Sequence, residues 1–328
     1  MGAFIVRRTV IGAFTIFLIG TLSFFIVSLP AGDYITSYIS QLESYGDEVG
    51  KETAESLRKT YGIDQPIYVQ WWKWASRFVR GDFGFSLEHN KPVRAVIGDH
   101  LVNNIVLALV TALLTWVMAL PIGIYSALRQ NSVGDYAFTF IGYVGLAVPD
   151  FLLALVLLYF GWVYFDTSIG GLFSSEYILE PWSIGKAVDM MAHLWIPAIV
   201  LGTSGTAALI RIMRANLLDE VYKPYVITAR AKGMGELKAV LKYPVRVALN
   251  PFISGIGYTL PQLVGGSVIV SVVLSLPTLG PLLLAALFSE DMHVAGAILT
   301  LLGALTIVGT LISDILLAIV DPRIRLEE

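Results

Sequence analysis

The sequence predicts an all-α integral membrane protein with six transmembrane helices. Its mean hydropathy is +0.72, and charged residues make up 14% of its 328 residues, against about 25% in a typical soluble domain. Several apolar runs are longer than the roughly 18 residues that a membrane-spanning helix needs. We expect the spans to cover residues 9–29, 101–128, 136–163, 194–212, 251–276 and 294–320.

The first span follows Arg7 and Arg8. An apolar run after a basic start is also typical of a cleaved signal peptide. This run is longer than a usual signal core, however, and no clean small-x-small cleavage site follows it. We therefore expect residues 1–30 to remain as an N-terminal tail and first transmembrane helix.

The distribution of Lys and Arg predicts that both chain ends lie in the cytoplasm, because cytoplasmic loops of membrane proteins are rich in these residues. With the N-terminus inside, the cytoplasmic cations are Arg7, Arg8, Arg129, Arg211, Arg214, Lys223, Arg230, Lys232, Lys238, Lys242, Arg246, Arg323 and Arg325. The short outer loops then contain Lys186 as their one cation. Residues 31–98 become an extracytoplasmic segment, and residues 99–328 a five-helix core whose longest cytoplasmic loop is 211–248.

The outer segment contains IDQPIYVQWWKWASRFVRGDFGFSL, which predicts an amphipathic helix. Trp71, Trp74 and Phe78 share one helical face, and the nearby cations lie largely off it. Aromatic residues favour the headgroup region of a membrane, where such a helix can lie flat. A small packed cap over the mouth of the bundle is the alternative, and the two interpretations are compatible.

The sequence lacks the motifs of an enzyme. It has no Cys, and its four His residues lie in the outer segment or near span ends without an i, i+4 pair. Neither His-Glu-x-x-His nor a Gly-x-x-x-x-Gly-Lys-Ser/Thr phosphate loop occurs. We therefore expect no catalytic residue, no metal site and no ATP hydrolysis by this chain. A secondary transporter is less favoured, because no repeat of the two halves and few membrane-depth charges are found.

Two acidic residues are expected at membrane depth, Asp150 in the third span and Asp314 near the inner end of the sixth. A charge there costs about 2.5–3.5 kcal/mol on insertion scales, so it should face a pore or a partner. Asp150 either faces the translocation pathway beside Pro149 or accepts the backbone N–H groups that Pro149 frees. We expect Asp314 to pair with a cation close to the cytoplasm.

The cytoplasmic loop contains YVITARAKGMGELKAVLKYP, residues 225–244. Most of these residues favour helix, and Gly233 and Gly235 interrupt them, which predicts two short helices with a bend between them. The cations favour an anchor on anionic lipid headgroups. The small residues Ala229, Ala231 and Gly233 favour instead a docking helix for a cytoplasmic partner, because they let another surface approach closely. Residue chemistry alone leaves both interpretations open.

The longer segment YVITARAKGMGELKAVLKYPVRVALNP resembles the cytoplasmic signature of B-type permease subunits of dipeptide and oligopeptide importers of the ATP-binding cassette (ABC) class. YGIDQPIYVQWWKWASRFVRGDFGFSLEHNKPV resembles the outer segment of that family. The segments LPIGIYSALRQ, VPDFLLAL, LSLPTLGPLL and DPRIRL resemble, in order, its second and third spans, its outer hairpin after the fifth span and its C-terminus. The resemblance covers nearly the whole chain and implies the fold of a type I ABC importer permease in a prokaryotic plasma (inner) membrane.

The same resemblance implies partners and cargo. A second, similar permease subunit would form the pathway with this chain, and an extracytoplasmic solute-binding protein would deliver the cargo. Two ATP-binding cassette ATPase subunits would hold ATP and magnesium, whereas this chain would bind no cofactor and no nucleic acid and would contact membrane lipid. The cargo implied is a peptide, with an oligosaccharide or another small solute such as a nickel complex as the alternative.

Members of that family place a coupling helix in a cleft of the ATPase. The matching positions here are Tyr225, Thr228, Ala229, Arg230, Ala231, Lys232 and Gly233. The glutamate that begins the broader signature is absent, as is common in the peptide family, and Ile227 stands in its place. Tyr243-Pro244 stands where the broader signature is apolar, and we expect Pro244 to end the second short helix one residue earlier.

Overall fold

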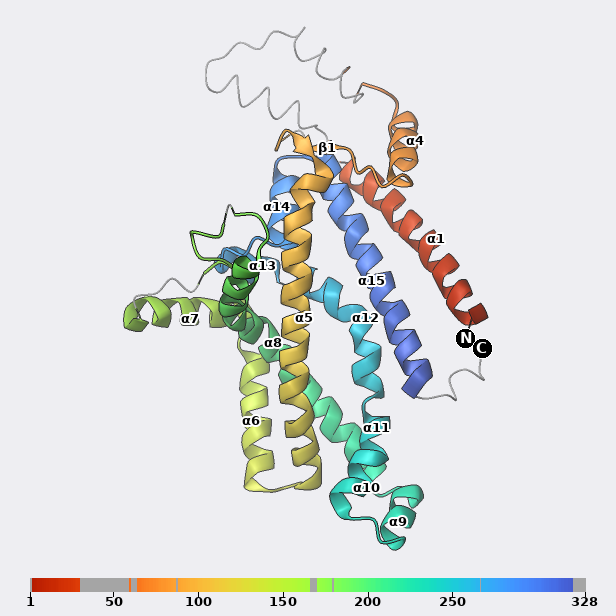
Figure 1. Ribbon diagram of the computed structural model, residues 1–328, viewed down its shortest axis with the longest axis vertical. Coiled ribbons are helices and arrows are strands. Elements are labelled where there is room, and N and C mark those ends of the chain that lie inside the picture. Colours follow the sequence, from red (N-terminus) through yellow and green to blue (C-terminus); the bar gives the residue numbers. More distant parts are fainter. Residues whose placement is uncertain are drawn as a thin grey trace. The chain divides into compact units, whose positions relative to one another are not determined.

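The computed structural model describes residues 2–29, 59, 64–86, 88–165, 170–178, 180–265 and 267–320 (Figure 1). Its elements are α1 (Gly2–Val27), α4 (Ile67–Phe78), β1 (Phe85–Ser86), β2 (Lys91–Pro92), α5 (Val93–Leu128), α6 (Val133–Ala147), α7 (Asp150–Phe165), α8 (Ile184–Val221), α9 (Pro224–Ala231), α10 (Glu236–Lys242), α11 (Pro244–Ala248), α12 (Asn250–Gly265), α13 (Val268–Val273), α14 (Leu279–Phe288) and α15 (Met292–Val320).

The all-α prediction is confirmed. Strand structure in the described residues is limited to β1 and β2, which form an antiparallel pair with Phe85 opposite Pro92. Four helices are long and apolar enough to cross a membrane, over Ile5–Val27, Val93–Leu128, Ile184–Val221 and Met292–Val320. The bent pair of α6 and α7 gives a fifth span if it is counted as one, so the predicted number of six spans stays a prediction.

The third expected span, 136–163, is not one continuous helix. It divides into α6 and α7, which meet at 97° across Val148 and Pro149. Val148 is extended, with φ −83° and ψ 120°, because the ring of a following proline disfavours the helical conformation. The fifth expected span, 251–276, also divides, into α12 and α13, with a turn at Ser267.

The chain packs into two compact units. The first contains Met1–Val6, Ile105–Leu276 and Val308–Glu328, and the second contains Arg7–Asn104 and Pro277–Ile307. The predicted division into 1–30, 31–98 and 99–328 concerns the sides of a membrane, which this packing does not test.

One core cluster of the first unit lies where α5, α8, α11 and α12 meet. Met213, Leu217 and Phe252 are fully buried there, and the rings of Trp116 and Phe252 meet edge to face at 5.8 Å. Gly123 lets α5 approach α8 closely, because a Cβ at this position would lie 2.6 Å from the Cβ of Met213. These contacts fix α5 and α8 as the frame that holds the rest of the unit.

The second unit packs α4 against α1. Trp74 lies 5.6 Å from Phe24 between ring centroids and stacks on Phe78 at 5.1 Å. The aromatic face of the amphipathic helix therefore packs against α1, and whether the segment caps the mouth of the bundle stays a prediction. Tyr68 and Trp72, beside this face, are exposed, at 69% and 67%.

Candidate functional site

The break between α6 and α7 positions the carboxylate of Asp150. Pro149 is the last residue before α7, and its carbonyl accepts the N–H groups of Leu152 and Leu153 at 2.9 and 3.1 Å. Asp150 is thus the first residue of α7 rather than a residue within a continuous span. Its Oδ2 accepts a hydrogen bond from Ser204 Oγ on α8 at 3.4 Å.

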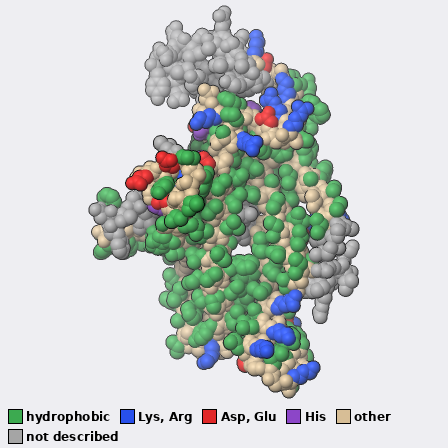
Figure 2. Space-filling view, viewed as in Figure 1, with side chains coloured by type: hydrophobic (Ala, Val, Ile, Leu, Met, Phe, Trp, Pro, Cys, Tyr) green, Lys and Arg blue, Asp and Glu red, His purple; other side chains and the backbone are tan. Residues whose placement is uncertain are grey.

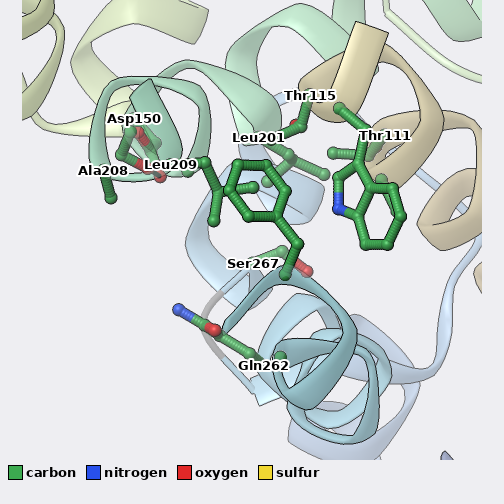
Figure 3. Close-up of a pocket in the computed structure, with 14 residues that line it drawn as sticks. Thr111, Thr115, Asp150, Leu201, Ala208, Leu209, Gln262 and Ser267 are labelled. Atoms are coloured by element: carbon green, nitrogen blue, oxygen red, sulfur yellow. Dashed lines mark hydrogen bonds between the residues drawn. The ribbon is translucent and has the colours of Figure 1, made fainter. Parts of the chain in front are cut away.

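Asp150 lies at a cavity of about 300 Å³ in the first unit (Figure 3). Residues from α5, α7, α8 and α12 line this cavity, together with Ser267 in the turn before α13. Its polar lining consists of Thr111, Thr115, Asp150, Ser204, Gln262 and Ser267, and its larger apolar lining of Trp116, Leu201, Leu209 and Phe252. A mostly apolar cavity with a few convergent polar groups is the usual form of a small-ligand site.

Thr111 belongs to the cavity lining, but its hydroxyl is buried. The residue is 3% exposed, and its Oγ1 has no partner among the described residues. A buried hydroxyl without a partner is unfavourable by about 1–3 kcal/mol. This oxygen exposes less than 1 Å² of surface, so the polar groups that a bound molecule could reach are those of the other lining residues.

A second candidate site is the short-helix hairpin, residues 224–242, formed by α9 and α10. Two short helices with a bend at Gly233 are observed, as expected from the sequence. Gly233 has φ +80°, a conformation in which side chains are strained, and its N–H donates to the carbonyl of Arg230 at 2.9 Å. The second helix ends at Lys242, before Pro244 begins α11.

Some of the residues predicted for the coupling helix lie on the surface of the hairpin, and one lies in its interior. Thr228, Ala231, Lys232 and Gly233 are exposed. Ala229 is buried, at 7%, so its methyl group packs within this chain instead of on the free surface. A small residue at this position serves the packing of the hairpin itself.

Polar contacts hold the hairpin in shape. Arg230 pairs with Glu236 across the bend at 2.7 Å. The hydroxyl of Tyr225 donates to the carboxylate of Glu220, which also pairs with Lys223 at 2.8 Å. Burial, followed by the hydrogen bond and charge of Glu220, raises the pKa of Tyr225 to about 12, so this side chain remains neutral and acts as a donor.

Charge is separated within the first unit. Figure 2 shows Lys and Arg gathered over α9 and α10, and Asp and Glu over the segment that precedes α8. Lys186, the one cation expected in the outer loops, is 7% exposed. Its Nζ donates to the carbonyl of Glu180 at 2.6 Å and lies 4.8 Å from the ring centre of Phe173, so the surface of this segment is left acidic.

Sequence reasoning missed a buried ion pair. Arg214 Nε and Nη2 donate to the two carboxylate oxygens of Asp135, each at 2.9 Å, and Asp135 is 2% exposed. The N–H of Asn131 donates to the same carboxylate at 3.0 Å. The pair joins the start of α6 to α8, and the only sequence signal for it is an acidic residue three positions after the N-cap Ser132.

The second unit brings Glu88, His89 and Asp291 close enough together to hold a metal ion. The oxygens of Asp291 already have donors, however. Ser86 Oγ donates to Oδ2 at 2.6 Å, and the N–H of Val294 donates to Oδ1 at 3.2 Å. These bonds join β1 to the first turn of α15, and the prediction that this chain holds no metal stays a prediction.

Long apolar helices, a mostly apolar cavity with a few polar groups, and a cationic hairpin of short helices outside the long apolar helices are the features of a multi-pass membrane protein and are consistent with the permease class. Two family models match the chain: "Binding-protein-dependent transport system inner membrane component" over residues 119–326, and its N-terminal counterpart over residues 1–108. The chain therefore belongs to the family of binding-protein-dependent transport system inner membrane components.

Curated relatives match over nearly their whole length. The oligopeptide transport system permease protein AppB of Bacillus subtilis (strain 168) is 37% identical, over 99% of this chain and 100% of its own. The inner membrane ABC transporter permease protein YejB of Escherichia coli O157:H7 is 31% identical, over 100% of both chains. The glutathione transport system permease protein GsiC of Escherichia coli (strain K12) is 29% identical, over 95% of both chains.

Proposed function

We propose that this chain is a permease subunit of an ABC importer that carries peptides, and that it forms the pathway with a second, similar permease. The relatives named for oligopeptide and glutathione transport support this cargo class, since both cargos contain peptide bonds. A solute-binding protein delivers the cargo on the outer side. Two separate ATPase subunits, which hold ATP and magnesium, drive its passage.

The observation that carries this proposal is the surface of the short-helix hairpin. Ile227, Leu237 and Leu241 are 54%, 62% and 49% exposed there, among exposed lysines and beside the open surface at Gly233. A lipid anchor needs the charges but not the bend that projects Gly233. Exposed apolar side chains, next to a glycine with open space around it, can fit into a cleft of another protein. We therefore assign α9 and the bend to docking on an ATPase subunit.

The proposal also includes the translocation pathway, with Pro149 and Asp150 on the route of the cargo. It is supported by the cavity that Asp150 lines and by the bend at Pro149 that directs the carboxylate toward α8.

Reconstitution tests the function. Vesicles containing this chain, its sister permease and the two ATPases are expected to take up short peptides only with ATP and the binding protein. The chain alone should not hydrolyse ATP, since it has no phosphate loop. Uptake of oligosaccharides and not peptides would contradict the cargo class, and ATP turnover by the pure chain would contradict the assignment as a permease subunit.

We also infer that both chain ends are cytoplasmic and that the segment before α8 lies outside. The cations over α9 and α10 and the acidic segment before α8 support this orientation. In intact cells, an impermeant thiol reagent should label Ser175→Cys, in the segment before α8, and leave Glu236→Cys unlabelled. Labelling of Glu236→Cys alone would reverse the orientation.

A further inference from the structure

Asp150 is the one charged side chain among the described residues that line the cavity. No lysine, arginine or histidine of the described lining stands opposite it. A carboxylate offers about four acceptor positions, and among the described residues this one receives a single, long hydrogen bond of 3.4 Å from Ser204. The cavity therefore contains a negative charge with most of its hydrogen-bonding capacity unused.

The contrast with Asp135 shows what a purely structural acid in the same unit looks like. Asp135 is neutralised by a bidentate pair with Arg214 at 2.9 Å and receives a backbone N–H as well. Asp150 has no ion pair within the part of the chain that the structure describes. An acid at the first position of a helix is favoured by the helix dipole, but that effect does not require the carboxylate to lie at a cavity.

The rest of the lining can contact the peptide backbone next to an ammonium group. Thr115 supplies a hydroxyl and Gln262 an amide, and each of these groups can both donate and accept a hydrogen bond. Trp116 and Phe252 provide aromatic rings, which favour cations near their faces. At about 300 Å³, the cavity has the volume for one end or one residue of a peptide and not for a whole chain.

We propose that this cavity binds a primary ammonium group of the cargo, with the carboxylate of Asp150 as its counter-charge. The group is the amino terminus of a peptide or the side chain of a lysine in it. The proposal rests on the proposed function for the presence of such a cargo, and it adds the chemical group that this subunit recognises.

The test uses the complete complex in vesicles, with n-butylammonium as a probe and n-butanol as its uncharged control. Butylammonium should inhibit peptide uptake by the wild type, and Asp150→Asn should raise the concentration for half-inhibition about tenfold, the usual effect of losing a charged hydrogen-bonding partner. Asn keeps the size of the side chain and its bond to Ser204. Glu176→Gln, which removes an exposed acid from the segment before α8, should behave as the wild type.

Two peptides identify the source of the ammonium group. A fall of about tenfold in trialanine uptake by Asp150→Asn assigns the amino terminus, and a similar fall for N-acetyl-Ala-Lys-Ala assigns the lysine side chain. The proposal would be overturned if Asp150→Asn took up each peptide as well as the wild type does. It would also be overturned if the two proteins were equally sensitive to butylammonium.

A binding measurement separates this proposal from the proposed function. Butylammonium should raise the thermal unfolding midpoint of the purified wild-type complex and not that of Asp150→Asn. If the wild type takes up no peptide but still shows this difference, the cargo class is wrong and the ammonium site stands. If the two complexes respond alike while peptide uptake is normal, the ammonium site is wrong and the function stands.

Discussion

Replacing Gly233 by tryptophan tests whether the short-helix hairpin docks on an ATPase. Gly233 has φ +80°, and a Cβ built there meets no atom within 4 Å. Any ordinary side chain therefore costs about 1–2 kcal/mol of backbone strain, and its Cβ adds no clash within this chain. Gly233→Trp and Gly233→Ala should thus destabilise the hairpin equally, and only the tryptophan adds bulk at the proposed contact.

The assay is binding-protein-stimulated ATP hydrolysis and peptide uptake by the reconstituted complex. We expect Gly233→Trp to lose at least about tenfold in both, equivalent to about 1.4 kcal/mol at the docking surface, and Gly233→Ala to stay near the wild type. Insertion and pairing with the sister permease should be normal in both variants, because the spans carry the stability of the bundle. If the alanine and tryptophan variants lost the same activity, the loss would come from backbone strain and the docking interpretation would fail.

A charge control separates docking from a lipid anchor. Arg230 is unsuitable because it pairs with Glu236 at 2.7 Å. Lys238→Gln combined with Lys242→Gln removes two exposed charges of α10 and leaves that pair and the proposed docking residues in place. A lipid anchor predicts that this double variant loses more uptake than Gly233→Trp, and docking predicts the reverse.

Three further substitutions test how the first unit is held together, each by thermal unfolding in detergent or by hydrogen exchange. Asp135→Ala should destabilise the unit by about 3 kcal/mol, because it leaves Arg214 without its buried partner, and adding Arg214→Met should restore most of the loss. Lys186→Met should speed amide exchange in residues 170–178, since it removes the bond to the Glu180 carbonyl and the contact with the Phe173 ring; unchanged exchange would contradict this. Gly257→Ala should cost about 1–3 kcal/mol, because its Cβ would lie 2.9 Å from the Thr310 backbone, whereas Gly255→Ala on the same helix, with open space around its Cβ, should cost little.

The features that could be predicted from the sequence are those that depend on local residue chemistry. The bend at Gly233 follows from the conformational freedom of glycine, and the end of α10 before Pro244 follows from the restriction that proline places on its neighbour. The length and hydropathy of the runs around residues 101–128 and 294–320 predicted α5 and α15 because membrane-spanning helices need little more than both.

The features that could not be predicted depend on packing between distant segments. Asp135 and Arg214 are 79 positions apart. The distribution of Lys and Arg identifies Arg214 only as one of many cytoplasmic cations. The burial of Ala229 depends on which face of an eight-residue helix turns inward, and so short a helix has too few turns to reveal that face. Pro149 was visible as a helix breaker, but the angle of 97° between α6 and α7 depends on how α7 packs against α8 and α13.

One continuous helix connects the two candidate sites. α8 carries Ser204 at the cavity and continues without a break to Val221, three residues before α9 begins. At 1.5 Å per residue this stretch is about 25 Å long. α11 packs against α8 beyond the hairpin, and the pair of Arg214 with Asp135 holds α6 to it as well. A force applied to the hairpin therefore acts on a stiff element that forms one wall of the cavity and that packs against α7, which carries Asp150. Measuring Gly233→Trp and Asp150→Asn singly and together would show whether this mechanical route is used: independent effects on uptake would multiply, and a shared route would make the double variant no worse than the more damaging single one.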